Sequence, residues 1–233
     1  MRNTDSEFGS GPDDHGLFLM ASRPVFIPNT ESAPLVFERS IDFAWSSGFS
    51  ESQKKKNIAA LHRAASRFGF KRILEISSKS DVEVGRRLSA FSLKLEVDGV
   101  EYPLESVYQG SKVFEKCGPS PEIFTFEPRE AKRHIRALNC GRLTGFELEG
   151  RSYPLFPKNA FYDWLYIKAL LKHSGWISRN ISYDAYTDIE FNPEKQINCQ
   201  ARAFAEYKSL TARDELKSAA NDFMYFASLL PPI

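Results

Sequence analysis

The chain has 233 residues, of which 42% are hydrophobic and 26% are charged, and its formal net charge is +1. This length suits one domain with a sizeable core, and the near-neutral charge excludes a protein that is basic over its whole surface, so any nucleic-acid affinity must be local. Three cysteines without CxxC spacing and four scattered histidines argue against a disulfide framework and a metal site. No apolar run approaches the roughly 20 residues of a membrane-spanning helix. We therefore expect a monomer of the reducing cytoplasm with no metal, no cofactor and no membrane contact.

The first 49 residues are predicted to form little regular structure. Residues 1–19 are polar and glycine-rich, and the segment EFGS resembles a cloning remnant, so we expect a disordered, tag-like leader. Residues 20–49 carry aromatic residues and prolines and are predicted to be irregular chain that wraps the core. A single domain is accordingly expected over residues 20–230.

The rest of the chain predicts an α+β domain that is mostly helical, with small antiparallel β hairpins. Ser50, with Gln53 three residues later, has the form of a capping box for the first helix. Asp98-Gly99 is the strongest hairpin turn signal in the chain. The predicted helices span, in order, 50–69, 105–116, 130–138, 157–173, 194–210 and 212–229. A strand is predicted over 70–77, and hairpins are predicted over 92–104 and 146–155.

The predicted helix 105–116 places three polar side chains on one face. At 100° per residue, Glu105, Gln109 and Lys112 fall within a fan of about 60°, opposite an apolar face. Glu105 and Lys112 are seven residues apart, so they are not the stabilising i,i+4 ion pair of a solvated helix. This face is either an ordinary solvated surface or the floor of a site.

A wider set of motifs surrounds this helix and resembles the NADAR (YbiA-like) family. The chain carries, in order, Ser89-Ala90-Phe91, Asp98-Gly99, Tyr102-Pro103 and an E-x-x-x-Q-x-x-K helix, followed by an acidic segment and a helix opened by an asparagine. The resemblance covers roughly 77–210. Ala90 stands where the family usually has asparagine, which removes one expected polar contact. The branch that the chain most resembles is the NADAR antitoxin that accompanies DarT-type toxins.

The resemblance implies an enzyme. Such antitoxins hydrolyse the N-glycosidic bond between ADP-ribose and guanine in DNA, so the expected partners are ADP-ribosylated DNA, the ADP-ribose product and a DarT-type ADP-ribosyltransferase toxin. Two alternatives remain open, namely an N-glycosidase acting on a small ribosylamine phosphate and a non-catalytic module that binds ADP-ribose or the toxin.

The chemistry of glycosidic cleavage assigns roles to the residues. An oxocarbenium-like centre calls for carboxylates and a proton donor, and an amine can instead attack the anomeric carbon. We assign Glu105 as acid/base, Lys112 as nucleophile or as the group that holds the ribose, and Asp184 as a second carboxylate, with Asp188 as the alternative. The predicted substrate-binding residues are Lys79, Ser89, Phe91, Tyr108, Gln109, Asp188 and Asn198.

Two further groups are candidates for contact with DNA. Basic patches at 54–56 and at Lys132, Arg133, Arg136 and Arg142 could hold a phosphate backbone, although a solvated face is the default for either. Tyr108, Phe161, Tyr162 and Trp164 are candidate stacking platforms for guanine, although most aromatic residues in such a helix belong to the core.

Overall fold

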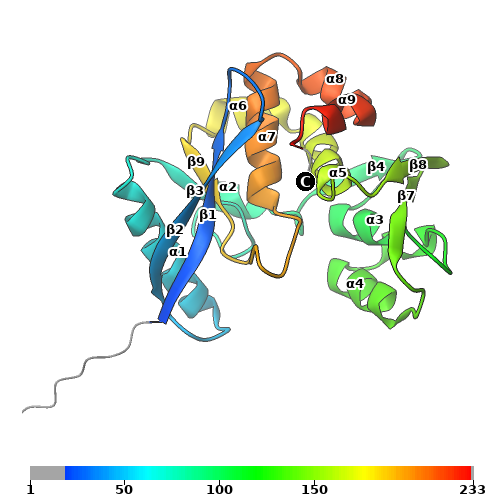
Figure 1. Ribbon diagram of the computed structural model, residues 1–233, viewed down its shortest axis with the longest axis horizontal. Helices are drawn as coiled ribbons and strands as arrows, with labels where there is room; N and C mark the ends of the chain where they lie inside the picture. The colour runs from blue at the N-terminus through cyan, green and yellow to red at the C-terminus, as the bar shows by residue number, and fades with distance from the viewer. Residues whose placement is uncertain (1–18, 232–233) are drawn as a thin grey trace, which may run out of the picture.

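The computed structural model describes residues 19–231, so the predicted leader falls almost wholly outside the described residues (Figure 1). The described chain is 41% helical and 22% strand, and its strands form three sheets. The prediction of a mostly helical domain with small hairpins is therefore wrong, and the fold is mixed α/β. None of the helices within the described range is long and apolar enough to cross a bilayer.

The largest sheet has four strands in the order β2-β1-β9-β3. It comprises β1 (Leu19–Pro28), β2 (Val36–Trp45), β3 (Ile73–Glu75) and β9 (Ala185–Thr187). The prediction of irregular chain over 20–49 is wrong, because β1 and β2 pair antiparallel along their whole length. Pro24 is tolerated inside β1 because β9 pairs with β1 only at Phe26, which leaves most of that edge without a partner strand.

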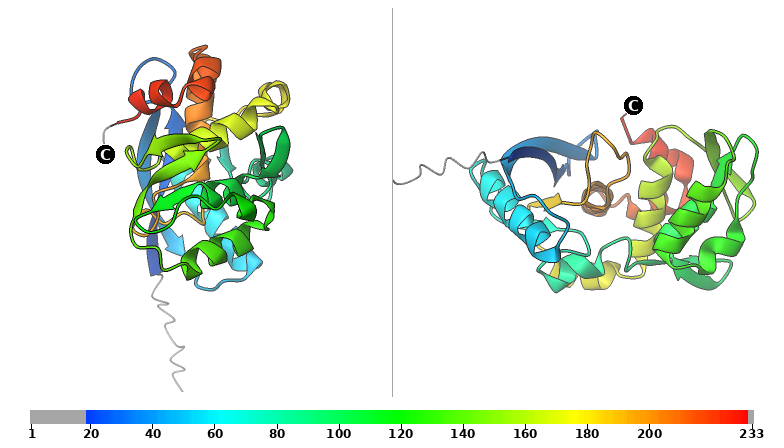
Figure 2. Two further views of the ribbon diagram at one scale, coloured as in Figure 1. Left: turned by 90° about the vertical axis from the view of Figure 1, so that its right-hand side faces the viewer. Right: turned by 90° about the horizontal axis from the view of Figure 1, so that it is seen from below.

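This sheet lies between two helices, α1 (Glu51–Ser66) and α7 (Gln200–Ala212), as two views show (Figures 1 and 2). Neighbouring residues of β1 serve opposite faces, as the two-residue period of a strand requires. Val25 packs into the cluster under α1, and Phe26 packs into the larger cluster that contains Phe204 of α7. We call β1, β2, β3, β9 and α1 the sheet half.

The remaining small sheets and two helices make up what we call the hairpin half. It contains β4 (Lys94–Val97), β5 (Val100–Pro103), α3 (Leu104–Gly110), β6 (Lys112–Phe114), α4 (Pro128–Ala137), β7 (Leu143–Leu148) and β8 (Arg151–Pro154). A short 3₁₀ helix, η1 (Pro121–Thr125), precedes α4. Both predicted hairpins are confirmed. Asp98 and Gly99 have φ of 49° and 78°, the two positive values that a two-residue hairpin turn requires.

The helix predicted over 105–116 ends early. It stops at Gly110, whose carbonyl oxygen accepts a hydrogen bond from the N–H of Ser120 at 2.7 Å in place of a further helical turn. Only glycine fits here, because a side chain would lie 2.6 Å from the ring of Phe124. The chain then extends, and Lys112 pairs with Phe146 of β7 as the first residue of β6. Lys112 therefore belongs to a strand, although it remains next to Gln109.

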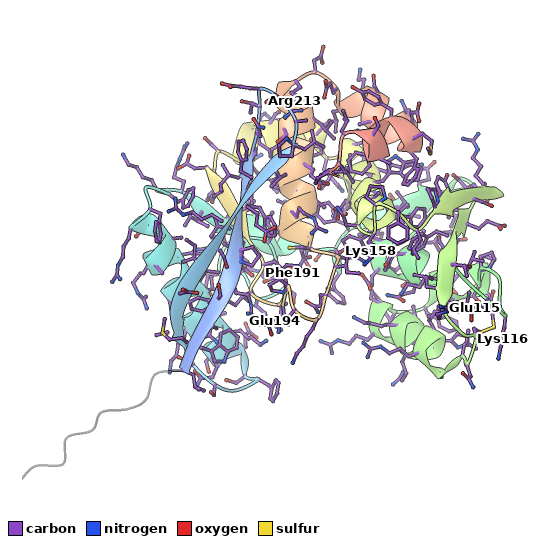
Figure 3. The ribbon with its side chains drawn as sticks, in the orientation of Figure 1. Glu115, Lys116, Lys158, Phe191, Glu194 and Arg213 are labelled. Carbon is purple, nitrogen blue, oxygen red and sulfur yellow. A yellow bond between two sulfur atoms is a disulfide. The ribbon has the colours of Figure 1, made fainter. Side chains whose placement is uncertain are left out.

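Further helices join the two halves. They are α2 (Glu83–Arg87), α5 (Ala160–Leu171), α6 (Ser174–Asn180), α8 (Leu216–Asn221) and α9 (Phe223–Ser228). The predicted helix 194–210 begins only at Gln200, and the preceding residues form a loop after β9. At the other end of α7, Arg213 donates to the carbonyl oxygen of Asn29 in the β1–β2 turn, at 2.6 Å and 3.1 Å (Figure 3).

Cys117 and Cys140 form a disulfide between the end of β6 and the start of β7. The expectation that the cysteines form no disulfide framework is therefore wrong at this position. Their spacing of 23 residues carries no local motif, and the antiparallel pairing of β6 with β7 is what brings the two residues together. The pair lies beside Glu115 and Lys116, at the edge of the hairpin half (Figure 3).

Candidate functional site

A cavity of about 620 Å³ lies between the two halves. Its floor is formed by α3 and the first residue of β6. Its walls come from the turn after β3 and from the loop between β9 and α7, and α4 forms part of the rim. The loop that carries Phe191 and Glu194 descends between the two halves (Figure 3). Eight of the ten predicted site residues line the cavity, namely Lys79, Phe91, Glu105, Tyr108, Gln109, Lys112, Asp188 and Asn198.

The other two predicted residues, Ser89 and Asp184, do not line this cavity. Ser89 is fully buried, and its carbonyl oxygen accepts hydrogen bonds from the N–H groups of two following residues. Asp184 lines a separate groove and is bound on both oxygens by Arg72, at 3.0 Å and 3.1 Å. Asp188, and not Asp184, is thus the aspartate beside the other predicted groups.

The three polar residues at the floor form a continuous hydrogen-bonded row. Lys112 Nζ donates to Gln109 Oε1 at 2.7 Å, and Gln109 Nε2 donates to Glu105 Oε1 at 2.8 Å. Glu105 is only 9% exposed and Gln109 only 3%. Because both ends of the Gln109 amide are occupied, this residue sets the positions of its two neighbours.

The Lys112 amine is partly buried and lies near other cations of the cavity. Burial lowers its pKa to about 8, and the cations of Lys132 and Arg136 act in the same direction, whereas Glu105 opposes the shift. At pH 7 about one amine in ten is then neutral, against about one in 3,000 at the ordinary pKa of lysine. Nζ also lies 4.8 Å from the ring centroid of Tyr108, which further fixes its place.

Asp188 is held by the residues on both sides of it. Glu75, at the end of β3, accepts from Thr187 Oγ1 at 2.7 Å and from the N–H of Ile189 at 2.9 Å. Burial raises the pKa of Asp188 to about 7, and burial together with the Asp188 charge raises the pKa of Glu75 to about 8. His62 completes this network through Thr187 at 2.8 Å, and burial lowers its pKa to about 4.

Gln200, the first residue of α7, joins the Ala90 turn to Asp188. Its Oε1 accepts from the N–H of Ala90 at 2.8 Å, and its side chain favours the ionised form of Asp188, which lowers the pKa of that residue against the effect of burial. Asn198 lies nearby, and its buried Oδ1 has no partner within residues 19–231.

The aromatic candidates divide by exposure. Phe161 and Trp164 are core residues, and Tyr108 and Tyr162 line the cavity while packing edge-on at 5.1 Å. Phe91 lines the cavity and is 52% exposed. It is the better placed platform for a base.

Sequence reasoning missed several residues of the site. Glu75 and Gln200 hold Asp188 from behind, and Arg129 and Lys195 line the cavity with the predicted Lys132 and Arg136. The signal for Glu75 was a carboxylate inside an apolar strand. No local pattern identified Gln200. The predicted basic patch is only partly at the cavity. Arg133 does not line the cavity, and Arg142 instead forms an ion pair with Glu115 at 2.8 Å.

A partly buried amine and two buried carboxyl groups thus lie beneath a cationic rim, an arrangement suited to a ligand with negative charge and to acid–base chemistry. The family of DarT1-associated NADAR antitoxins matches residues 21–232, nearly the whole chain, and the chain belongs to this family. The resemblance inferred from the motifs is thereby confirmed, as is the association with a DarT-type toxin. The family is known for glycosidase-type hydrolase activity. None of the curated proteins compared with the chain matches it.

Proposed function

We propose that this antitoxin is a DNA ADP-ribosylguanine glycohydrolase. It hydrolyses the N-glycosidic bond between ADP-ribose and the guanine amino group, and so reverses the modification made by a DarT-type toxin. The observation that carries the proposal is the hydrogen-bonded row of Glu105, Gln109 and Lys112 at the cavity floor, with a partly neutral amine at its end. A module that only bound ADP-ribose would not need such an amine beside two buried carboxyl groups.

The first step breaks the glycosidic bond. Neutral Lys112 Nζ attacks the anomeric carbon of the ribose, and the bond from this carbon to the guanine nitrogen breaks. The electron pair stays on the guanine nitrogen, which takes a proton from Glu105 or Asp188. Burial raises the pKa of both carboxyl groups, and that of Asp188 reaches about 7, so Asp188 carries a proton in part of the molecules near neutral pH.

The second step releases the sugar. The ribose ring opens to an imine with Lys112, and the ring oxygen takes up a proton released by Nζ. Water adds to the imine carbon, assisted by the carboxylate left by the first step, and the amine departs. The products are ADP-ribose and unmodified guanine, so the sum is one hydrolysis with no other reactant.

The test is release of ADP-ribose from a guanine-ADP-ribosylated oligonucleotide, measured by liquid chromatography, with thymine-linked DNA as the control substrate. We expect turnover of the guanine adduct, and we expect Lys112→Ala and Glu105→Gln to abolish release while ADP-ribose still binds by calorimetry. If both variants released ADP-ribose at the wild-type rate, the assignment of Lys112 and Glu105 as catalytic residues would be wrong. An untouched oligonucleotide together with turnover of ribosylamine phosphates would replace the antitoxin substrate with a small metabolite.

A further inference from the structure

Helix α4 presents three cations to the cavity from one side. Arg129, Lys132 and Arg136 fall within a fan of about 60°, and all three line the cavity rim. The apolar residues Ala131 and Ile135 anchor the helix from another side, where they pack in a small cluster with Phe126. We call Arg129, Lys132 and Arg136 the α4 cation row.

The α4 cation row has no acidic partner. None of its members forms an ion pair with a carboxylate within residues 19–231. All three side chains are exposed, whereas Glu105 and Gln109 at the floor are buried. A ligand that contacts both the buried floor and the exposed row must therefore place its reacting bond deep in the cavity and its negative charge along α4.

The length of the row indicates how many phosphates it can meet. Arg129 and Arg136 are seven residues apart, about 10 Å along the helix axis, which equals the axial rise of about three nucleotides of a B-form DNA strand. ADP-ribose alone brings two adjacent phosphates, and the opposite wall offers it Lys79 and Lys195. The cavity thus carries more cationic groups than the pyrophosphate needs, distributed on two sides.

We propose that the α4 cation row binds the phosphate backbone of the DNA strand that carries the modified guanine, while the opposite wall receives the pyrophosphate. The identity of the strand rests on the proposed function, whereas the contact itself is between the row and backbone phosphates, which an unmodified strand also carries. Phe91, exposed at the same cavity, offers a stacking face to a base of that strand.

The test compares two substrates that share the reacting bond and differ in the strand. One is a guanine-ADP-ribosylated oligonucleotide, and the other is ADP-ribosylated deoxyguanosine without flanking phosphates. The variant is R129Q/K132Q/R136Q. The matched control is R133Q, a cation of the same helix that is exposed, points away from Ala131 and Ile135 and does not line the cavity.

We expect the triple variant to lower the ratio of kcat/KM for the oligonucleotide to kcat/KM for the nucleoside, and R133Q to leave that ratio unchanged. Using the ratio cancels any effect of Lys132 and Arg136 on the pKa of Lys112. Loss of three phosphate contacts reduces the log–log salt slope for a single strand by about 2, which is about 16-fold over a fourfold rise in salt. An unchanged ratio, or an equal effect of R133Q, would overturn the assignment.

Binding of an unmodified single-stranded oligonucleotide, followed by fluorescence anisotropy, separates this proposal from the proposed function. If the wild-type protein cleaves neither substrate, the glycohydrolase proposal fails. The anisotropy titration still tests whether the α4 cation row binds a DNA strand. Tighter salt-sensitive binding by the wild type than by the triple variant supports the row, and equal binding rejects it.

Discussion

The sharpest prediction concerns whether Lys112 attacks the ribose or only holds it, and Lys112→Arg separates the two roles. Arginine keeps the positive charge and the donors toward Gln109, but its guanidinium stays protonated because its pKa exceeds 12. The wild-type amine, with a pKa of about 8, is about one-tenth neutral at pH 7. If the neutral amine is the nucleophile, kcat falls by a factor on the order of 10³ or more in the arginine variant.

The dependence of kcat/KM on pH is a second test of whether Lys112 is the nucleophile. For nucleophilic Lys112 with Asp188 as the acid, the profile of kcat/KM is bell-shaped. The rate rises as the amine, with a pKa of about 8, loses its proton, and falls as Asp188, with a pKa of about 7, loses the proton that it gives to guanine. Lys132 lowers the pKa of Lys112 through its charge, so Lys132→Gln raises that pKa and moves the pH optimum upward. The nucleoside substrate should be used, since it isolates the chemistry from strand binding.

Borohydride trapping identifies the intermediate. Reduction during turnover converts an imine into a stable amine, so mass spectrometry should find ADP-ribose attached at Lys112. The nucleophile assignment is refuted by an arginine variant within about tenfold of wild type, with a flat pH profile and no adduct. Lys112 would then act by holding the ribose while a carboxylate activates water.

Three further predictions concern the scaffold. Gly85→Ala places a methyl group against the carbonyl oxygen of Glu75 and should lower the free energy of unfolding by about 1–3 kcal/mol. Gly118→Ala is the control, because its methyl group enters open space and should leave the free energy of unfolding unchanged. Thermal denaturation of the two variants measures the difference. Cys117→Ser opens the loop closed with Cys140 and should cost about 3 kcal/mol by urea titration, an effect that reductant reproduces in the wild type. The pKa of Glu75 is raised to about 8, so its protonated form favours the native state. Stability should therefore fall as pH rises from about 4.5, the ordinary pKa of glutamate, to about 8, and Glu75→Gln should flatten this decline; a parallel decline in the variant would contradict it.

Local chemistry is what the sequence predicts well. Ser50 accepts from the N–H of Gln53 and caps α1 as expected, and Asp98-Gly99 forms the expected turn. In each case the decisive interaction lies within four residues. These elements could be placed without knowing anything of the rest of the chain.

The errors come from interactions between distant segments. The helix beginning at Leu104 stops where Ser120 binds the carbonyl oxygen of Gly110 and the chain pairs with β7, and no pattern within 105–116 contains that information. The pairing of β1 with β2 was missed because prolines indicated irregular chain. Only the fold shows that most of the second edge of β1 has no partner strand.

The choice between the two aspartates could not be made from sequence for the same reason. Both lie beside the three-residue strand β9, four positions apart, and either could face a ligand. Arg72, 112 residues earlier, binds Asp184 and keeps it at the other end of the strand. Glu75 binds Thr187 and Ile189 on either side of Asp188 and so presents it to the cavity.

The site depends on the two halves keeping one relative position, because each supplies part of the chemistry. Lys112 comes from the hairpin half, and Asp188 comes from the end of the central sheet. Between the halves, α5 and α7 are joined by a buried pair in which Arg202 Nε lies 3.3 Å from Asp163 Oδ2. A buried pair of this kind adds little net stability compared with apolar packing, yet it penalises any arrangement that separates its members. We interpret the pair as a device that fixes the register of α5 on α7 and, through it, the distance between the amine and the acid.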